Sequence, residues 1–73
     1  MTRFELLGIP YNTILTLKGN IKAAKLPIEI KKKFKEGESF KFLKMNVKLN
    51  FVLGEIENGE VYKFKLKKLL KVL

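Results

Sequence analysis

The chain contains no cysteine, histidine, aspartate, glutamine or tryptophan, and its one serine is Ser39. Without cysteine and histidine it has no disulfide framework, no Cys/His metal site, and no thiol or imidazole for catalysis. Among the seven glutamates, Glu55, Glu57 and Glu60 cluster beside an expected turn, where no cleft allows them to act as general acid and base. We therefore expect a protein that is not an enzyme and that uses no cofactor or metal.

Long apolar runs are also missing. The longest is Phe51–Leu53, which is far too short to span a membrane, and residues 1–10 contain Glu5 in place of the apolar block of a signal peptide. A cytoplasmic location is the default expectation. Because 47% of the 73 residues are hydrophobic, we expect one folded domain over residues 1–73. A domain this small without cross-links depends on packing or self-association, so a homodimer is considered.

What the chain does have is lysine. Sixteen residues are Lys or Arg, with Arg3 the single arginine, and the formal net charge is +9. A field this positive attracts polyanions, and nucleic acid is the first partner to consider. The alternative is composition bias of the kind that hyperthermophiles or A·T-rich genomes produce. Thermophile surfaces usually carry both signs of charge, so the excess favours polyanion binding.

The second half of the chain has the period of a β-strand. From Lys44 to Leu53, apolar and polar residues alternate, which predicts a core face containing Met45, Val47, Leu49, Phe51 and Leu53. Asn58-Gly59 predicts a two-residue hairpin turn that places Leu53 opposite Phe64. An unbroken strand from Ser39 to Glu55 would exceed about 50 Å, so a bulge is expected near Leu43 or Gly54.

The remaining segments are less regular. Arg3–Ile9 reads as a strand, and Gly19-Asn20 reads as a turn that pairs residues 13–18 with residues 21–24. Pro27, followed by Ile30 and Phe34 on one face, predicts a short helix over about residues 27–36; the alternative is a strand followed by a turn at residues 35–38. Spacing at the C-terminus predicts a short amphipathic helix built on Leu66, Leu69, Leu70 and Leu73.

Together these patterns predict a β-rich α+β domain. We expect a small antiparallel sheet, or a partly open barrel, of about four to six strands with one short helix and a further short helix at the C-terminus.

Two groups of lysines are the candidate functional residues. The predicted hairpin places one group on a single sheet face, with Phe40 and Phe42 at its end: lysines would bind phosphates and the aromatic rings would stack on bases. The alternative for both phenylalanines is a core position after a bulge. The second group lies in the predicted helix. The lysines are Lys44, Lys48, Lys63, Lys65 and Lys67 in the first group, and Lys31, Lys32, Lys33 and Lys35 in the second.

The residue types define the expected mode of binding. Lysine is a point charge, and a single arginine gives little capacity to read base edges, so we expect binding of DNA or RNA that tolerates sequence variation. The alternative function is a small adaptor or inhibitor that binds an acidic surface of a protein partner, anchored by an edge strand or by the C-terminal leucines.

Overall fold

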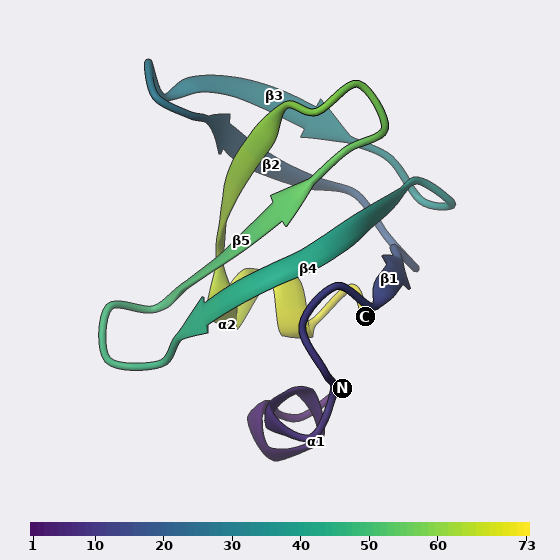
Figure 1. The fold of residues 1–73 in the computed structure, drawn as a ribbon. Helices are drawn as coiled ribbons and strands as arrows, with labels where there is room; N and C mark the ends of the chain where they lie inside the picture. The colour runs from purple at the N-terminus through teal and green to yellow at the C-terminus, as the bar shows by residue number, and fades with distance from the viewer.

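Six antiparallel strands form a single open sheet with a short helix at each end of the chain (Figure 1). The computed structural model describes all residues from Met1 to Leu73. The predicted β-rich α+β class and the strand number are confirmed. The elements are α1 (Arg3–Leu7), β1 (Ile14–Thr16), β2 (Ile21–Lys25), β3 (Ile30–Phe34), β4 (Ser39–Asn46), β5 (Phe51–Glu55), β6 (Val61–Lys65) and α2 (Leu66–Leu70).

The sheet joins a three-stranded meander to a hairpin. Strands β4, β5 and β6 follow one another, β2 and β3 pair with each other, and β6 pairs with β2 to connect the two units. Strand β1 pairs with the free side of β4, so the strand order is β1-β4-β5-β6-β2-β3. The predicted hairpin between residues 13–18 and 21–24 is wrong, because β1 and β2 lie on different parts of the sheet.

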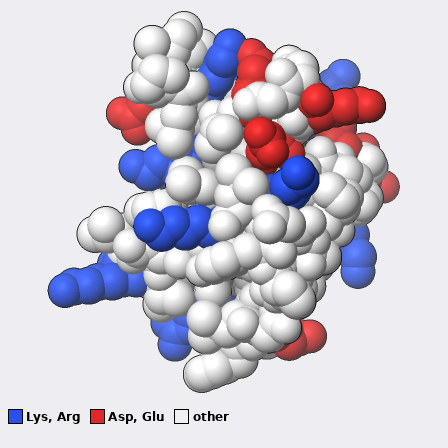
Figure 2. Space-filling view, in the orientation of Figure 1, with Lys and Arg blue, Asp and Glu red and all other residues white.

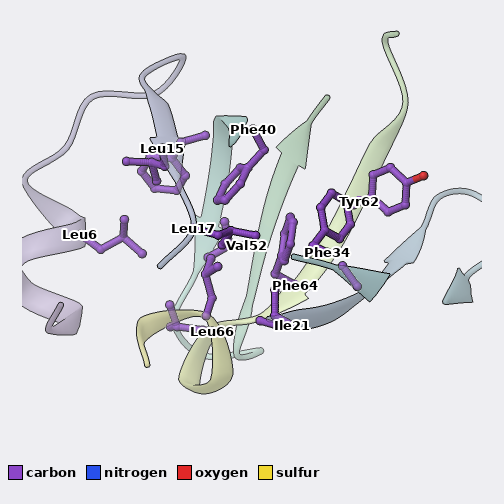
Figure 3. Packing of buried hydrophobic residues seen from close by; sticks show 13 residues of the cluster. Leu6, Leu15, Leu17, Ile21, Phe34, Phe40, Val52, Tyr62, Phe64 and Leu66 are labelled. Carbon is purple, nitrogen blue, oxygen red and sulfur yellow. The ribbon is translucent and has the colours of Figure 1, made fainter. Parts of the chain in front are cut away.

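The hydrophobic core lies on one face of this sheet (Figure 3). Its centre is a group of phenylalanines: the rings of Phe40 and Phe64 stack with centroids 4.7 Å apart, and Phe34 contacts Phe64 at 5.2 Å. Such aromatic pairs add to the stability that burial alone provides. Leu66 and Leu69 of α2 close the core from one end, which confirms the predicted C-terminal helix.

A bulge at Leu43 confirms the expected irregularity of the long strand. The pairing register between β4 and β5 shifts between Phe42 and Lys44. The extra residue turns Phe40 and Phe42 into the core, where they are 2% and 1% exposed. Their proposed role as stacking platforms is therefore wrong, and the alternative core position is the one that they occupy.

The alternating segment from Lys44 to Leu53 is a hairpin and not one continuous strand. Strand β4 ends at Asn46, residues 47–50 form a turn, and β5 begins at Phe51. The turn is stabilised by the Leu49 N–H, which donates to Asn46 Oδ1 at 2.9 Å, and by Asn50, which adopts a positive φ of 58°. Asparagine tolerates this left-handed conformation better than most residues, so the chain reverses here.

The turn at Asn58-Gly59 is present, but it is one residue longer than predicted. The Ile56 N–H donates to the carbonyl oxygen of Glu60 at 3.0 Å, and Gly59 has a φ of 86°, as in a three-residue loop that ends in a left-handed residue. Val52, not Leu53, therefore lies opposite Phe64. A shift of one residue exchanges the two faces of a strand, and so Val52 is in the core while Leu53 is not.

The predicted helix over about residues 27–36 is wrong. Residues Ile30–Phe34 form strand β3, which pairs along its whole length with β2, so the alternative prediction of a strand is the correct one. The following turn fits that prediction: Gly37 adopts a φ of 91°, and Glu38 Oε1 accepts a hydrogen bond from the Lys35 N–H at 2.8 Å. Sheet pairing with β2 and burial of the Phe34 ring override the helical spacing.

The predicted strand over Arg3–Ile9 is also wrong, because this segment contains helix α1. Thr2 and Glu5 form a capping box: the Glu5 N–H donates to the Thr2 hydroxyl and the Thr2 N–H donates to the Glu5 carboxylate. These hydrogen bonds satisfy donors that the helix leaves free and begin the helix at Arg3. Both helices have five residues, and neither has the length or the apolar content to cross a membrane.

Candidate nucleic-acid interface

Lysines gather on the side of the sheet that points away from the core, which we call the outer face. Strand pairing defines it: Ala24 on β2 pairs with Lys31 on β3 and with Lys63 on β6, and Lys63 pairs with Leu53 on β5. Lys44 pairs with Leu53 from the other side. This row of paired residues crosses five strands, β4, β5, β6, β2 and β3, and carries three lysines, Lys44, Lys63 and Lys31, whose side chains project in the same direction.

A groove runs between the outer face and the C-terminal segment, and lysines line most of it. We call it the lysine groove. Lys68 and Lys71 reach it from α2 and the residue that follows α2, and no glutamate lines it. All of its lysines are exposed, and none forms an ion pair. The residues that line it are Lys22, Lys31, Lys33, Lys65, Lys68 and Lys71, together with Asn20, Ile21 and Val72.

The glutamates lie mainly elsewhere, so the molecule has charge of opposite sign in different regions. A separate hollow beside the β5–β6 turn is lined by Glu38, Glu55 and Glu57. Figure 2 shows acidic side chains gathered at the upper right of the view, while most of the lysines that it shows extend on the left. The lysine groove itself contains no glutamate, although Glu29 lies in the adjoining hollow with Lys31 and Lys65, so the groove has a net positive potential.

The ion pairs that do form lie outside the lysine groove. Lys25 pairs with Glu60, Lys41 Nζ lies 3.7 Å from Glu55, and Lys63 Nζ lies 3.8 Å from Glu29. The Lys25 ammonium, helped by hydrogen bonds from Asn58 and Tyr62, lowers the pKa of Glu60 from 4.5 to about 2. Glu60 is therefore held as an anion beside the β5–β6 turn, and its contacts with Lys25, Asn58 and Tyr62 give this carboxylate a structural role in that turn.

One aromatic side chain lies on the outer face. Phe51 is half-buried on β5, pairs with Lys65 on β6, and is neither part of the core cluster nor packed against it. The Lys63 ammonium lies 5.3 Å from the centre of the Phe51 ring. Lys31 and Lys65 line both the lysine groove and the shallow hollow around Phe51, so the two surfaces are continuous.

The structure divides the predicted site residues into separate groups. Lys31, Lys33 and Lys65 lie in the lysine groove, and Lys63 and Lys44 lie on the outer face beyond it. Lys48 and Lys67 line a different hollow with Arg3. Lys32 points to the core side of β3, with its ammonium 4.8 Å from the centre of the Phe34 ring, and Lys35 lies in the turn after β3. Phe40 and Phe42 are buried.

Four members of this surface are not among the predicted residues: Lys22, Lys68, Lys71 and Phe51. Lys22 lies on a strand whose partner was predicted incorrectly. Lys68 lies in the C-terminal helix and Lys71 directly follows it; the apolar face of this helix was predicted, and its polar side is the signal that could have identified both lysines. Phe51 could have been found only with the correct turn at residues 47–50, because that turn decides the face on which its ring lies.

Comparison of the chain with protein-family models, with curated proteins and with solved structures found no match. The side chains also provide no cluster of three or more carboxylate, imidazole or thiol groups that could hold a metal ion. The geometry and charge of the outer face are therefore the basis of any functional conclusion.

Proposed function

We propose that this protein binds the phosphate backbone of nucleic acid through the lysine groove and has no enzymatic activity. The observation that carries the proposal is the convergence of six exposed lysines from β2, β3, β6 and the C-terminal segment on one groove without a glutamate. These lysines come from three separate segments of the sequence, at residue 22, residues 31–33 and residues 65–71, so the fold, and not one local run of lysines, creates this concentration of charge.

Mutual repulsion makes such an arrangement unfavourable unless an anion occupies it. Like charges on neighbouring strands destabilise a sheet, and Lys22 and Lys33 are directly paired across β2 and β3. A chain of phosphates would remove this repulsion and would release its own counterions when it binds. Lysine ammonium groups contact phosphates without reading base edges, so the expected binding tolerates sequence variation in DNA or RNA.

Charge reversal in the groove tests the proposal. The variant Lys22→Glu/Lys65→Glu is compared with Lys35→Glu/Lys48→Glu, which lowers the net charge equally at positions outside the groove. Fluorescence anisotropy with labelled DNA and RNA measures the dissociation constants. We expect the groove variant to lose about tenfold or more in affinity and the control to lose about threefold or less. Equal losses would contradict a specific role of the groove.

The alternative function, binding to an acidic protein surface, loses one of its two proposed anchors. Leu66 and Leu69 are buried in the core of the domain itself, and Leu70 and Leu73 pack against it. Binding of a partner through Leu66 and Leu69 would therefore require the domain to unfold locally, and Leu70 and Leu73 are only partly exposed. An edge strand, β3, is still available for pairing, but it carries three consecutive lysines, which is how natural sheets discourage edge-to-edge association.

A further inference from the structure

We infer that the outer face selects single-stranded nucleic acid, with Phe51 as the stacking platform for a base beside the lysine groove. This inference rests on the proposed function, because the lysines supply the affinity for phosphate. The juxtaposition that carries it is a half-buried phenylalanine ring in a hollow lined by three lysines and one glutamate and continuous with the groove; the charged residues are Lys31, Lys63, Lys65 and Glu29.

The position of Phe51 is unusual among the phenylalanines of this chain. Phe34, Phe40, Phe42 and Phe64 are all 2% exposed or less and belong to the core. Phe51 contributes nothing to that core, although it lies on a central strand between β4 and β6. An aromatic ring on the solvent side of a sheet, bordered by cations, is the arrangement with which sheet-based proteins bind single strands.

The contacts of the ring suggest how a base would be accepted. The Lys63 ammonium lies near the ring, 5.3 Å from its centre, and also 3.8 Å from the Glu29 carboxylate. Both partners of Lys63 are solvent-accessible, so these interactions are weak and the side chain can move aside. A base that stacks on Phe51 would take the place of the ammonium, which would then be close to the phosphate of the same nucleotide.

Duplex nucleic acid cannot use this platform without base-pair disruption, since its bases are stacked on one another. A phosphate chain lying in the lysine groove would reach Phe51 through Lys31 and Lys65, which border both surfaces. The same lysines therefore serve duplex and single strands, while the ring adds affinity only for a strand with an unpaired base. Phe51 therefore determines the preference of the protein for single-stranded over duplex nucleic acid.

Two variants of Phe51 test this inference with three probes of equal length: oligothymidylate, a duplex, and an abasic oligonucleotide. Phe51→Leu keeps an apolar side chain but removes the aromatic face. We expect it to weaken binding of oligothymidylate by about fivefold or more and to leave binding of the abasic strand unchanged. Phe4→Leu, which changes the one fully exposed phenylalanine at a position outside this surface, is the control and is expected to bind all three probes as the natural chain does.

Phe51→Trp gives a direct signal, because the chain contains no other tryptophan. We expect its fluorescence to be quenched by oligothymidylate and not by the abasic strand. Circular dichroism shows whether both variants are folded. Unchanged affinity in Phe51→Leu, together with no base-dependent quenching in Phe51→Trp, would overturn the inference while leaving the groove intact. If the natural chain binds none of the three probes, the proposed function itself fails.

Discussion

Lys31 and Lys63 lie on either side of Ala24, one on β3 and the other on β6, and both project from the outer face. Neighbouring strands are about 4.8 Å apart, so the two lysines are separated by roughly 10 Å across the sheet. The Ala24 side chain between them is only 8% exposed, so the longer side chains around it cover it and the two lysines border the same part of the outer face. The pairing of β2 with β3 and β6 thus brings together two lysines that are 32 residues apart in the sequence, on the face where we propose that phosphates bind.

The first prediction concerns Gly54, which faces the core from β5. A Cβ atom at this position would collide with Phe40 Cδ2 and would lie 3.0 Å from Phe64 Cε1, closer than most Cβ contacts in proteins. We expect Gly54→Ala to destabilise the domain by about 1–3 kcal/mol, because the stacked rings must move. Urea denaturation measures this loss. Gly8→Ala is the control, since its Cβ would have ordinary contacts, and an equal loss in both variants would contradict the packing described for Gly54.

The second prediction separates core residues from binding residues. Phe40 was a candidate for base stacking, but its ring stacks on Phe64 inside the core. Phe40→Leu is expected to lower the free energy of unfolding by less than the roughly 3–5 kcal/mol of a truncation to alanine. Its affinity for oligothymidylate should equal that of the natural chain at a temperature where both are folded. A reduced affinity in the folded variant would place Phe40 at the interface after all.

The third prediction is a pH dependence caused by Glu60. Its pKa is about 2 in the folded protein, against an ordinary value of 4.5, because Lys25, Asn58 and Tyr62 favour the anion. A lowered pKa contributes stability that is fully present above about pH 4.5 and is lost as the pH falls toward about 2. The natural chain should therefore be more stable than Glu60→Gln near neutral pH.

Thermal melting of both proteins from about pH 6 down to about pH 2 measures this effect. The difference between the two melting temperatures should shrink over the acid part of the range. The other glutamates titrate in both proteins and cancel in the comparison. A difference that stays constant with pH would show that Glu60 is not held as an anion by its partners.

The sequence predicted the class of the fold because the class depends on strong local signals. The alternation of polar and apolar residues, the Asn58-Gly59 turn and the C-terminal spacing of leucines all identify elements that are present. The register could not be predicted with the same certainty. One bulged residue at Leu43 and one extra residue in the turn before Val61 each exchange the faces of a strand. The length of the segment predicted a bulge near Leu43 or Gly54 without choosing between the two positions, and the extra turn residue leaves no clear mark in the sequence.

The candidate site shows the same limit. Lys63 and Lys65 were assigned to the solvent side of a sheet and are found there, because their position does not depend on the pairing partner. The aromatic residue beside them was assigned incorrectly, since Phe40 and Phe51 exchange roles when the register shifts. Lys22 lies beside Lys31 and Lys33 because β2 pairs with β3. The helical spacing of Ile30 and Phe34 predicted a helix in place of β3, so this pairing could not be predicted.

The salt dependence of binding to oligothymidylate tests the central claim most directly. If three to six lysines of the groove contact phosphates, the logarithm of the association constant should fall with the logarithm of salt concentration with a slope of about −2 to −4. In Lys22→Gln/Lys65→Gln the slope should become less steep by about 1.4, because two contacts are lost. A slope that is the same in both proteins would contradict the account, since the phosphates would then be bound somewhere else.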